Sequence, residues 1–157
     1  MTSNEATVVM TRVFDAPRSR VFEAWTRAEH LGRWFAPKGF SITDCESDPR
    51  PGGVFRMRWH APWGGTYQVR GEYREVIVPE RVVIACTLDD EQGASRLEEI
   101  INVDFEQNGS RTKLLLESSA RGAGAKAASM LAGMEKGWAQ TVDRLGVLLD
   151  PKPHKEM

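Results

Sequence analysis

The feature that most constrains the fold is a long stretch of strand-like sequence that ends in one helical pattern. From about residue 126 to 149, side chains recur at the spacing of a single helix face: Met130, Met134, Trp138, Thr141, Leu145 and Leu148 or Leu149. A helix with such a face needs a sheet or other helices to cover it. We therefore expect an uninterrupted C-terminal helix that packs against a curved sheet, with a cavity enclosed between the helix and the sheet.

The sequence before this helix predicts about seven β-strands. Residues 6–14 are rich in β-branched side chains, which favour a strand. Apolar residues alternate with polar ones at 55–59 and 67–73, which is typical of a strand with one buried face. Further strands are expected near 40–47, 82–88, 97–105 and 114–116. The short turns between them predict antiparallel neighbours.

Residues 18–36 interrupt the strand pattern with helical spacing. Val21, Phe22, Trp25 and Leu31 recur at this spacing, and we expect two short helices with a break near 26–29. The predicted class is α+β, in one domain over residues 1–157. Its core spans about 6–149, and a flexible tail follows at 151–157.

Composition excludes several classes of protein. The length of 157 residues suits one domain. The 21 basic and 22 acidic side chains are interspersed along the sequence, which does not indicate a nucleic-acid-binding surface. We find neither a signal peptide nor an apolar run of the ~20 residues that span a bilayer, so we expect a cytoplasmic protein. Cys45 and Cys86 are too far apart in sequence for a Cys-x-x-Cys pair, and we expect two buried free thiols.

The inward rows of the predicted sheet and helix are rich in aromatic and methionine side chains, as in an adaptable apolar ligand site. The candidate ligand-binding residues are Trp34, Phe55, Met57, Trp59, Tyr67, Tyr73, Glu99, Ile101, Met130, Met134 and Trp138. The alternative is that these side chains pack against one another as a solid core. Trp63, and Trp34 with Phe35, are candidates for the cavity mouth or, equally, for caps on the sheet edge.

Glu99 falls in an otherwise apolar inward row. An inward carboxylate could orient a polar ligand group or act as an acid or base. Alternatively, Glu99 begins its strand at the rim of the sheet, in water, and we favour this interpretation. The three histidines form no constellation, and we find no nucleophile elbow, phosphate loop or metal-ligand spacing. No catalytic residue, metal or cofactor is predicted.

Several segments, in their order and spacing, resemble a known family. They are RVFDAPRSRVFEAWT from residue 12, Trp34-Phe35-Ala36-Pro37, Arg50-Pro51-Gly52-Gly53, Gly71-Glu72-Tyr73, Val78-Pro79-Glu80-Arg81 and Gly137-Trp138-Ala-Gln-Thr. Together they are similar to bacterial proteins related to the C-terminal domain of the activator of the heat-shock protein 90 ATPase. This family belongs to the START-like, or SRPBCC, superfamily.

The resemblance implies a helix-grip fold, in which a curved antiparallel sheet wraps around a long C-terminal helix. It also implies a hydrophobic ligand between helix and sheet, and in some relatives a cyclase or hydrolase reaction. The motifs begin near residue 6, so the chaperone-docking domain of the eukaryotic activator has no counterpart, and we expect no chaperone partner. The sequence departs from the usual pattern at Ala85-Cys86, where relatives often have Thr-Trp, and at 117–119, where a histidine is frequent.

Three functions follow as hypotheses. The first is a binding module for a small hydrophobic or amphipathic molecule. The second is a cyclase- or hydrolase-type enzyme that uses Glu99, Tyr67 or Tyr73 as acid or base in the same cavity. The third is a protein-interaction role through the outer face of the sheet, connected with stress response. The sequence leaves the oligomeric state open, a homodimer included.

Overall fold

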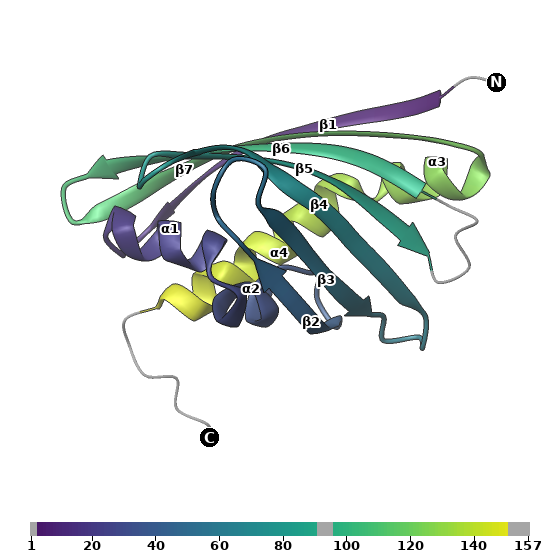
Figure 1. Cartoon of the computed structure of the whole chain (residues 1–157), viewed down its shortest axis with the longest axis horizontal. Coiled ribbons are helices and arrows are strands. Elements are labelled where there is room, and N and C mark those ends of the chain that lie inside the picture. The colour runs from purple at the N-terminus through teal and green to yellow at the C-terminus, as the bar shows by residue number, and fades with distance from the viewer. Residues whose placement is uncertain (1–2, 91–95, 151–157) are drawn as a thin grey trace.

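A computed structural model describes residues 3–90 and 96–150, and the predicted flexible tail at 151–157 lies outside these ranges. The fold is the α+β helix grip, with a curved antiparallel sheet that holds the helices on its concave face (Figure 1). The strands are β1 (Ser3–Phe14), β2 (Ser41–Ser47), β3 (Val54–His60), β4 (Thr66–Ile77), β5 (Arg81–Asp90), β6 (Arg96–Asn108) and β7 (Arg111–Ala123). The helices are α1 (Arg18–Thr26), α2 (Ala28–Trp34), α3 (Ala125–Ala132) and α4 (Met134–Leu149).

The seven strands form one sheet in the order β1-β7-β6-β5-β4-β3-β2. Every neighbouring pair is antiparallel, as the short turns predicted. The first strand therefore lies beside the last, and α1 and α2 carry the chain across to the opposite edge at β2. In Figure 1, α4 runs diagonally beneath the sheet, with α1 and α2 at one end and α3 at the other.

The alternation of side chains in the strands is confirmed. In β3, Phe55 and Met57 are buried while Arg56 and Arg58 are exposed. In β6, the side chains of Ile101, Val103 and Phe105 are at most 2% exposed. Because successive side chains of a strand point to opposite faces, these rows fix which face of each strand covers the helices.

The prediction of one uninterrupted C-terminal helix is wrong. The helix breaks at Gly133, which ends α3 and begins α4. Glycine has a low helix propensity, and the two halves share β1 but otherwise pack on different elements, which favours a break at this residue. α3 contacts β7 and β1, whereas α4 contacts α2, β1 and α1. The predicted pair of short helices in residues 18–36 is confirmed, with Arg27 between them.

A cluster of aromatic rings fills the space between the sheet and the two short helices. Trp25 packs edge-on against Trp34 at 4.8 Å between ring centroids, and Phe35 packs in the same way against Phe55 at 5.3 Å. Trp138 of α4 stacks on Trp25 at 6.3 Å. This end of the concave face is therefore tightly packed.

Candidate functional site

A cavity of about 530 Å³ lies between the sheet and the helices, beyond the aromatic cluster. Its volume is within the range of about 300–1,000 Å³ that is common for small-molecule sites. Strands β4 to β7 contribute Tyr67, Val69, Leu88 and Leu97, together with Cys86, Glu99 and Ala120. The wall is mainly apolar, and the opposite side is formed by α3 and α4.

The exposed residues of the lining are Trp63 in the β3–β4 turn and, on α3, α4 and the junction between them, Lys126, Ser129, Gly133 and Lys136, and we call this side the mouth of the cavity. Trp63 stands in this turn with 70% of its surface exposed, and its ring packs on Phe40 at 5.5 Å. Lys126 and Lys136 line the opposite side and are exposed. Nζ of Lys126 donates to Oδ2 of Asp90 at 3.0 Å, which joins α3 to the end of β5.

Six of the eleven candidate ligand-binding residues line this cavity. They are Trp59, Tyr67, Glu99, Met130, Met134 and Trp138. The two methionines lie on either side of the helix break, and Trp138 separates the cavity from the aromatic cluster.

The other five candidate residues do not line the cavity and are at most 2% exposed. They are Trp34, Phe55, Met57, Tyr73 and Ile101. Trp34 is in the core rather than at the mouth, because its Nε1 donates to the carbonyl of Ala24 at 2.9 Å. The hydroxyl of Tyr73 is 2.6 Å from Oγ of Ser47, and burial raises the pKa of the Tyr73 hydroxyl. Tyr73 therefore has no access to a ligand in this cavity.

Glu99 faces the cavity, so the rim position that we favoured from the sequence is wrong. Its Oε2 accepts a hydrogen bond from Nε1 of Trp138 at 3.2 Å and is 2.5 Å from Oγ of Ser118. Burial raises the pKa of the carboxyl group, and the hydrogen bonds from Ser118 and Trp138 oppose part of that rise. A carboxyl group in this position can exchange hydrogen bonds with a bound molecule.

Ser118 and Cys86 were not among the candidates, although both positions fall where the sequence departs from the family pattern. Ser118 is fully buried and holds Glu99, while Cys86 lines the cavity directly opposite Glu99 on the next strand. Burial and the neighbouring Glu99 raise the pKa of the Cys86 thiol. Cys86 is buried and Cys45 is half-buried, and both thiols are free.

Arg144 was also missed, because its role depends on residues more than a hundred positions away. From α4, its Nη1 donates to the carbonyl oxygens of Ala36, Pro37 and Phe40, each at 3.0 Å. Pro37 and Phe40 line the cavity. One guanidinium group therefore holds the segment that forms one wall.

Neither a membrane span nor a metal centre is found in the described part of the chain. No described helix is long and apolar enough to cross a bilayer. Within residues 3–90 and 96–150, no group of three or more histidine, cysteine, aspartate or glutamate side chains is arranged to hold a metal ion.

Comparison with known proteins supports the assignment that the motifs suggested. The sequence model of the family described as activator of Hsp90 ATPase homolog 1-like protein matches residues 15–150. The chain belongs to this family. No curated protein matches the sequence.

Solved structures of similar proteins share the fold over nearly the whole chain. A protein from Chromobacterium violaceum is 25% identical, with a TM-score of 0.74 over 93% of this chain and 98% of that one. The AHSA1 protein from Silicibacter pomeroyi is 21% identical, with a TM-score of 0.74 over 92% and 97% of the two chains. A protein from Arthrobacter aurescens is 19% identical, with a TM-score of 0.76 over 96% and 93%. These likenesses establish the helix-grip fold for this family member.

Proposed function

We propose that this protein binds a small, mainly apolar molecule in the cavity between the sheet and α3 and α4. The observation that carries the proposal is the cavity itself, which stays open beside a tightly packed aromatic core. Protein interiors are normally close-packed, so a space of about 530 Å³ lined by apolar side chains is a site for a ligand rather than a packing fault.

The lining supports an amphipathic ligand with a ring or chain as its main body. Trp59, Tyr67 and Trp138 offer flat apolar surfaces, and Met130 and Met134 can adapt to different shapes. The lining includes three neutral polar residues on the helices, Ser129, Gln140 and Thr141, and three charged residues. Glu99 lies on the sheet side, and the lysines lie at the mouth.

Native mass spectrometry of freshly purified protein tests this proposal. We expect a population with additional mass that is lost on denaturation, and extraction should release a small apolar compound. A single apo mass, together with failure of an apolar dye to bind the native protein, would contradict it.

Catalysis in the same cavity is a second candidate, favoured by one observation. The raised pKa of Glu99 in apolar surroundings is the property that a general acid or base requires. Any such activity should disappear in Glu99→Gln, while an apolar dye without a donor group should still bind. An activity that survives this substitution would rule out Glu99 as the acid or base.

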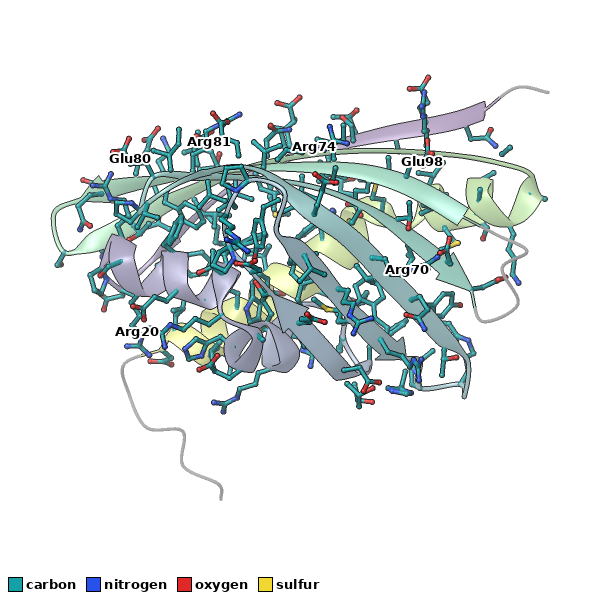
Figure 2. The ribbon with its side chains drawn as sticks, viewed as in Figure 1. Arg20, Arg70, Arg74, Glu80, Arg81 and Glu98 are labelled. Atoms are coloured by element: carbon teal, nitrogen blue, oxygen red, sulfur yellow. The ribbon has the colours of Figure 1, made fainter. Side chains whose placement is uncertain are left out.

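The outer face of the sheet offers less support for the protein-interaction hypothesis. Figure 2 shows Arg74, Arg81 and Glu98 on the face away from α4. Arg81 donates to Glu75 at 2.8 Å and to Asp104 at 2.9 Å, and Arg121 donates to Glu98 at 3.0 Å. Charged side chains that form ion pairs with their neighbours on the same surface are typical of a face exposed to solvent.

A further inference from the structure

The two oxygens of the Glu99 carboxyl group have different surroundings. Oε2 is held by Trp138 and Ser118, which fixes the rotation of the group. Among the described residues, no hydrogen bond or ion pair reaches Oε1. Because Glu99 lines the cavity and Oε2 is engaged, Oε1 is the oxygen left for a ligand.

Among the side chains that the structure describes, no cation pairs with this oxygen. The residues beside it across the sheet are Cys86 on β5 and Ala120 on β7. The lysines that line the cavity lie at its mouth, and Lys126 is engaged by Asp90. Oε1 is open to the cavity, and a ligand that covers it without offering a donor leaves this acceptor unpaired at a cost in free energy, which a bound donor avoids.

From this geometry we infer that Glu99, in its ionised form, selects ligands that carry an N–H or O–H donor on the buried end of an apolar body. The inference rests on the proposed function, since it assigns a ligand class to the same cavity. The donor hydrogen-bonds to Oε1 while aromatic rings cover the rest of the molecule. A ligand whose buried end carries only acceptors places lone pairs against the carboxylate and is rejected.

Substitution of Glu99 by glutamine should reverse this selection. Trp138 can only donate, so the amide oxygen of the glutamine must take the place of Oε2. The amide nitrogen then occupies the position of Oε1 and presents a donor to the cavity. Glu99→Gln should therefore prefer ligands with an acceptor on the buried end.

Four naphthalene probes of similar size test the inference by calorimetric titration at pH 8.5. They are 2-naphthylmethanol, which offers a neutral donor, 2-naphthylmethylamine, a cationic donor, 2-acetonaphthone, an acceptor, and 2-ethylnaphthalene, which offers neither. We expect the wild type to bind both donor probes about tenfold more tightly than 2-ethylnaphthalene. In Glu99→Gln that gain should vanish, and 2-acetonaphthone should become the preferred probe.

The matched control is Glu98→Gln, which makes the same chemical change on the outer face, where Glu98 is paired with Arg121 (Figure 2). This variant should keep the wild-type preference. If 2-ethylnaphthalene binds the wild type as tightly as the donor probes, the inference is overturned while the binding function stands. If none of the four binds, both are overturned. The wild-type comparison needs no variant, so it decides the question even where Glu99→Gln fails to fold.

Discussion

At the scale of single residues, Trp138 connects the fold to the cavity. It is 7% exposed, stacks on Trp25, packs edge-on against Phe35 at 5.8 Å and donates to Glu99. We expect Trp138→Ala to lower the free energy of unfolding by about 3 to 5 kcal/mol, because a large buried side chain is replaced by empty space. Urea denaturation measures this change. Trp63→Ala, at an exposed tryptophan, is the control and should change stability little.

Glu99 gives a pH dependence whose sign follows from its raised pKa. Between the ordinary pKa of an unfolded glutamate, about 4.3, and the higher native value, the folded protein keeps a proton that the unfolded chain has released. The carboxyl group therefore lowers stability progressively as the pH rises through this window. Relative to wild type, Glu99→Gln should gain stability over the same window. A stability difference that is constant from pH 4 to 9 would show that Glu99 is not desolvated.

At the scale of elements, the sequence predicts strands better than it predicts free space. Alternation determines which face of a strand is buried, and for β3 and β6 it identified the inward rows correctly. The alternation does not tell whether a buried side chain packs against another side chain or faces a cavity. Phe55 and Trp59 belong to one row, yet Phe55 meets Phe35 in the core while Trp59 lines the cavity. That difference depends on where Phe35, at the end of α2, meets the strand.

The close pairing of β4 and β5 explains the Gly71-Glu72-Tyr73 motif. A Cβ atom at Gly71 would lie 2.0 Å from the carbonyl oxygen of Ala85 and 2.6 Å from Cα of Cys86. Gly71→Ala must push these strands apart, and we expect thermal denaturation to show that the free energy of unfolding falls by at least about 1 to 3 kcal/mol.

Gly32→Ala is the control. A Cβ at this position in α2 meets nothing closer than 3.8 Å, and stability should rise by about 0.5 to 1 kcal/mol. Equal effects of the two substitutions would contradict the explanation.

Arg144 holds the segment between α2 and β2 against α4. Loss of its hydrogen bonds to three carbonyl oxygens in Arg144→Gln should lower the free energy of unfolding by about 1.5 to 3 kcal/mol. Hydrogen exchange at residues 35–40 should accelerate. Arg12→Gln is the control, because Arg12 pairs with the exposed Asp143 at the surface, where such a pair contributes about 0 to 1 kcal/mol. Unchanged exchange in Arg144→Gln would mean that the segment is held by its apolar contacts alone.

At the scale of the whole molecule, the curved sheet is covered in two different ways. The aromatic side chains of α1 and α2 fill one end of its concave face, whereas α3 and the start of α4 leave the other end open. The sequence predicted the helix grip because the strand alternation and the helical face each have a clear period. It did not predict this division, since packing density depends on the relative placement of all the elements.

The most direct test of the account is the binding of N-phenyl-1-naphthylamine to the wild type and to Met134→Trp, followed by fluorescence. Met134 is half-buried on the cavity wall, so a tryptophan there should fill open space. We expect saturable binding to the native wild type, at least about tenfold weaker binding to Met134→Trp, and a change in unfolding free energy below about 1.5 kcal/mol. If the wild type showed no saturable binding and Met134→Trp were strongly destabilised, the space would be a packed core and the binding function would be contradicted.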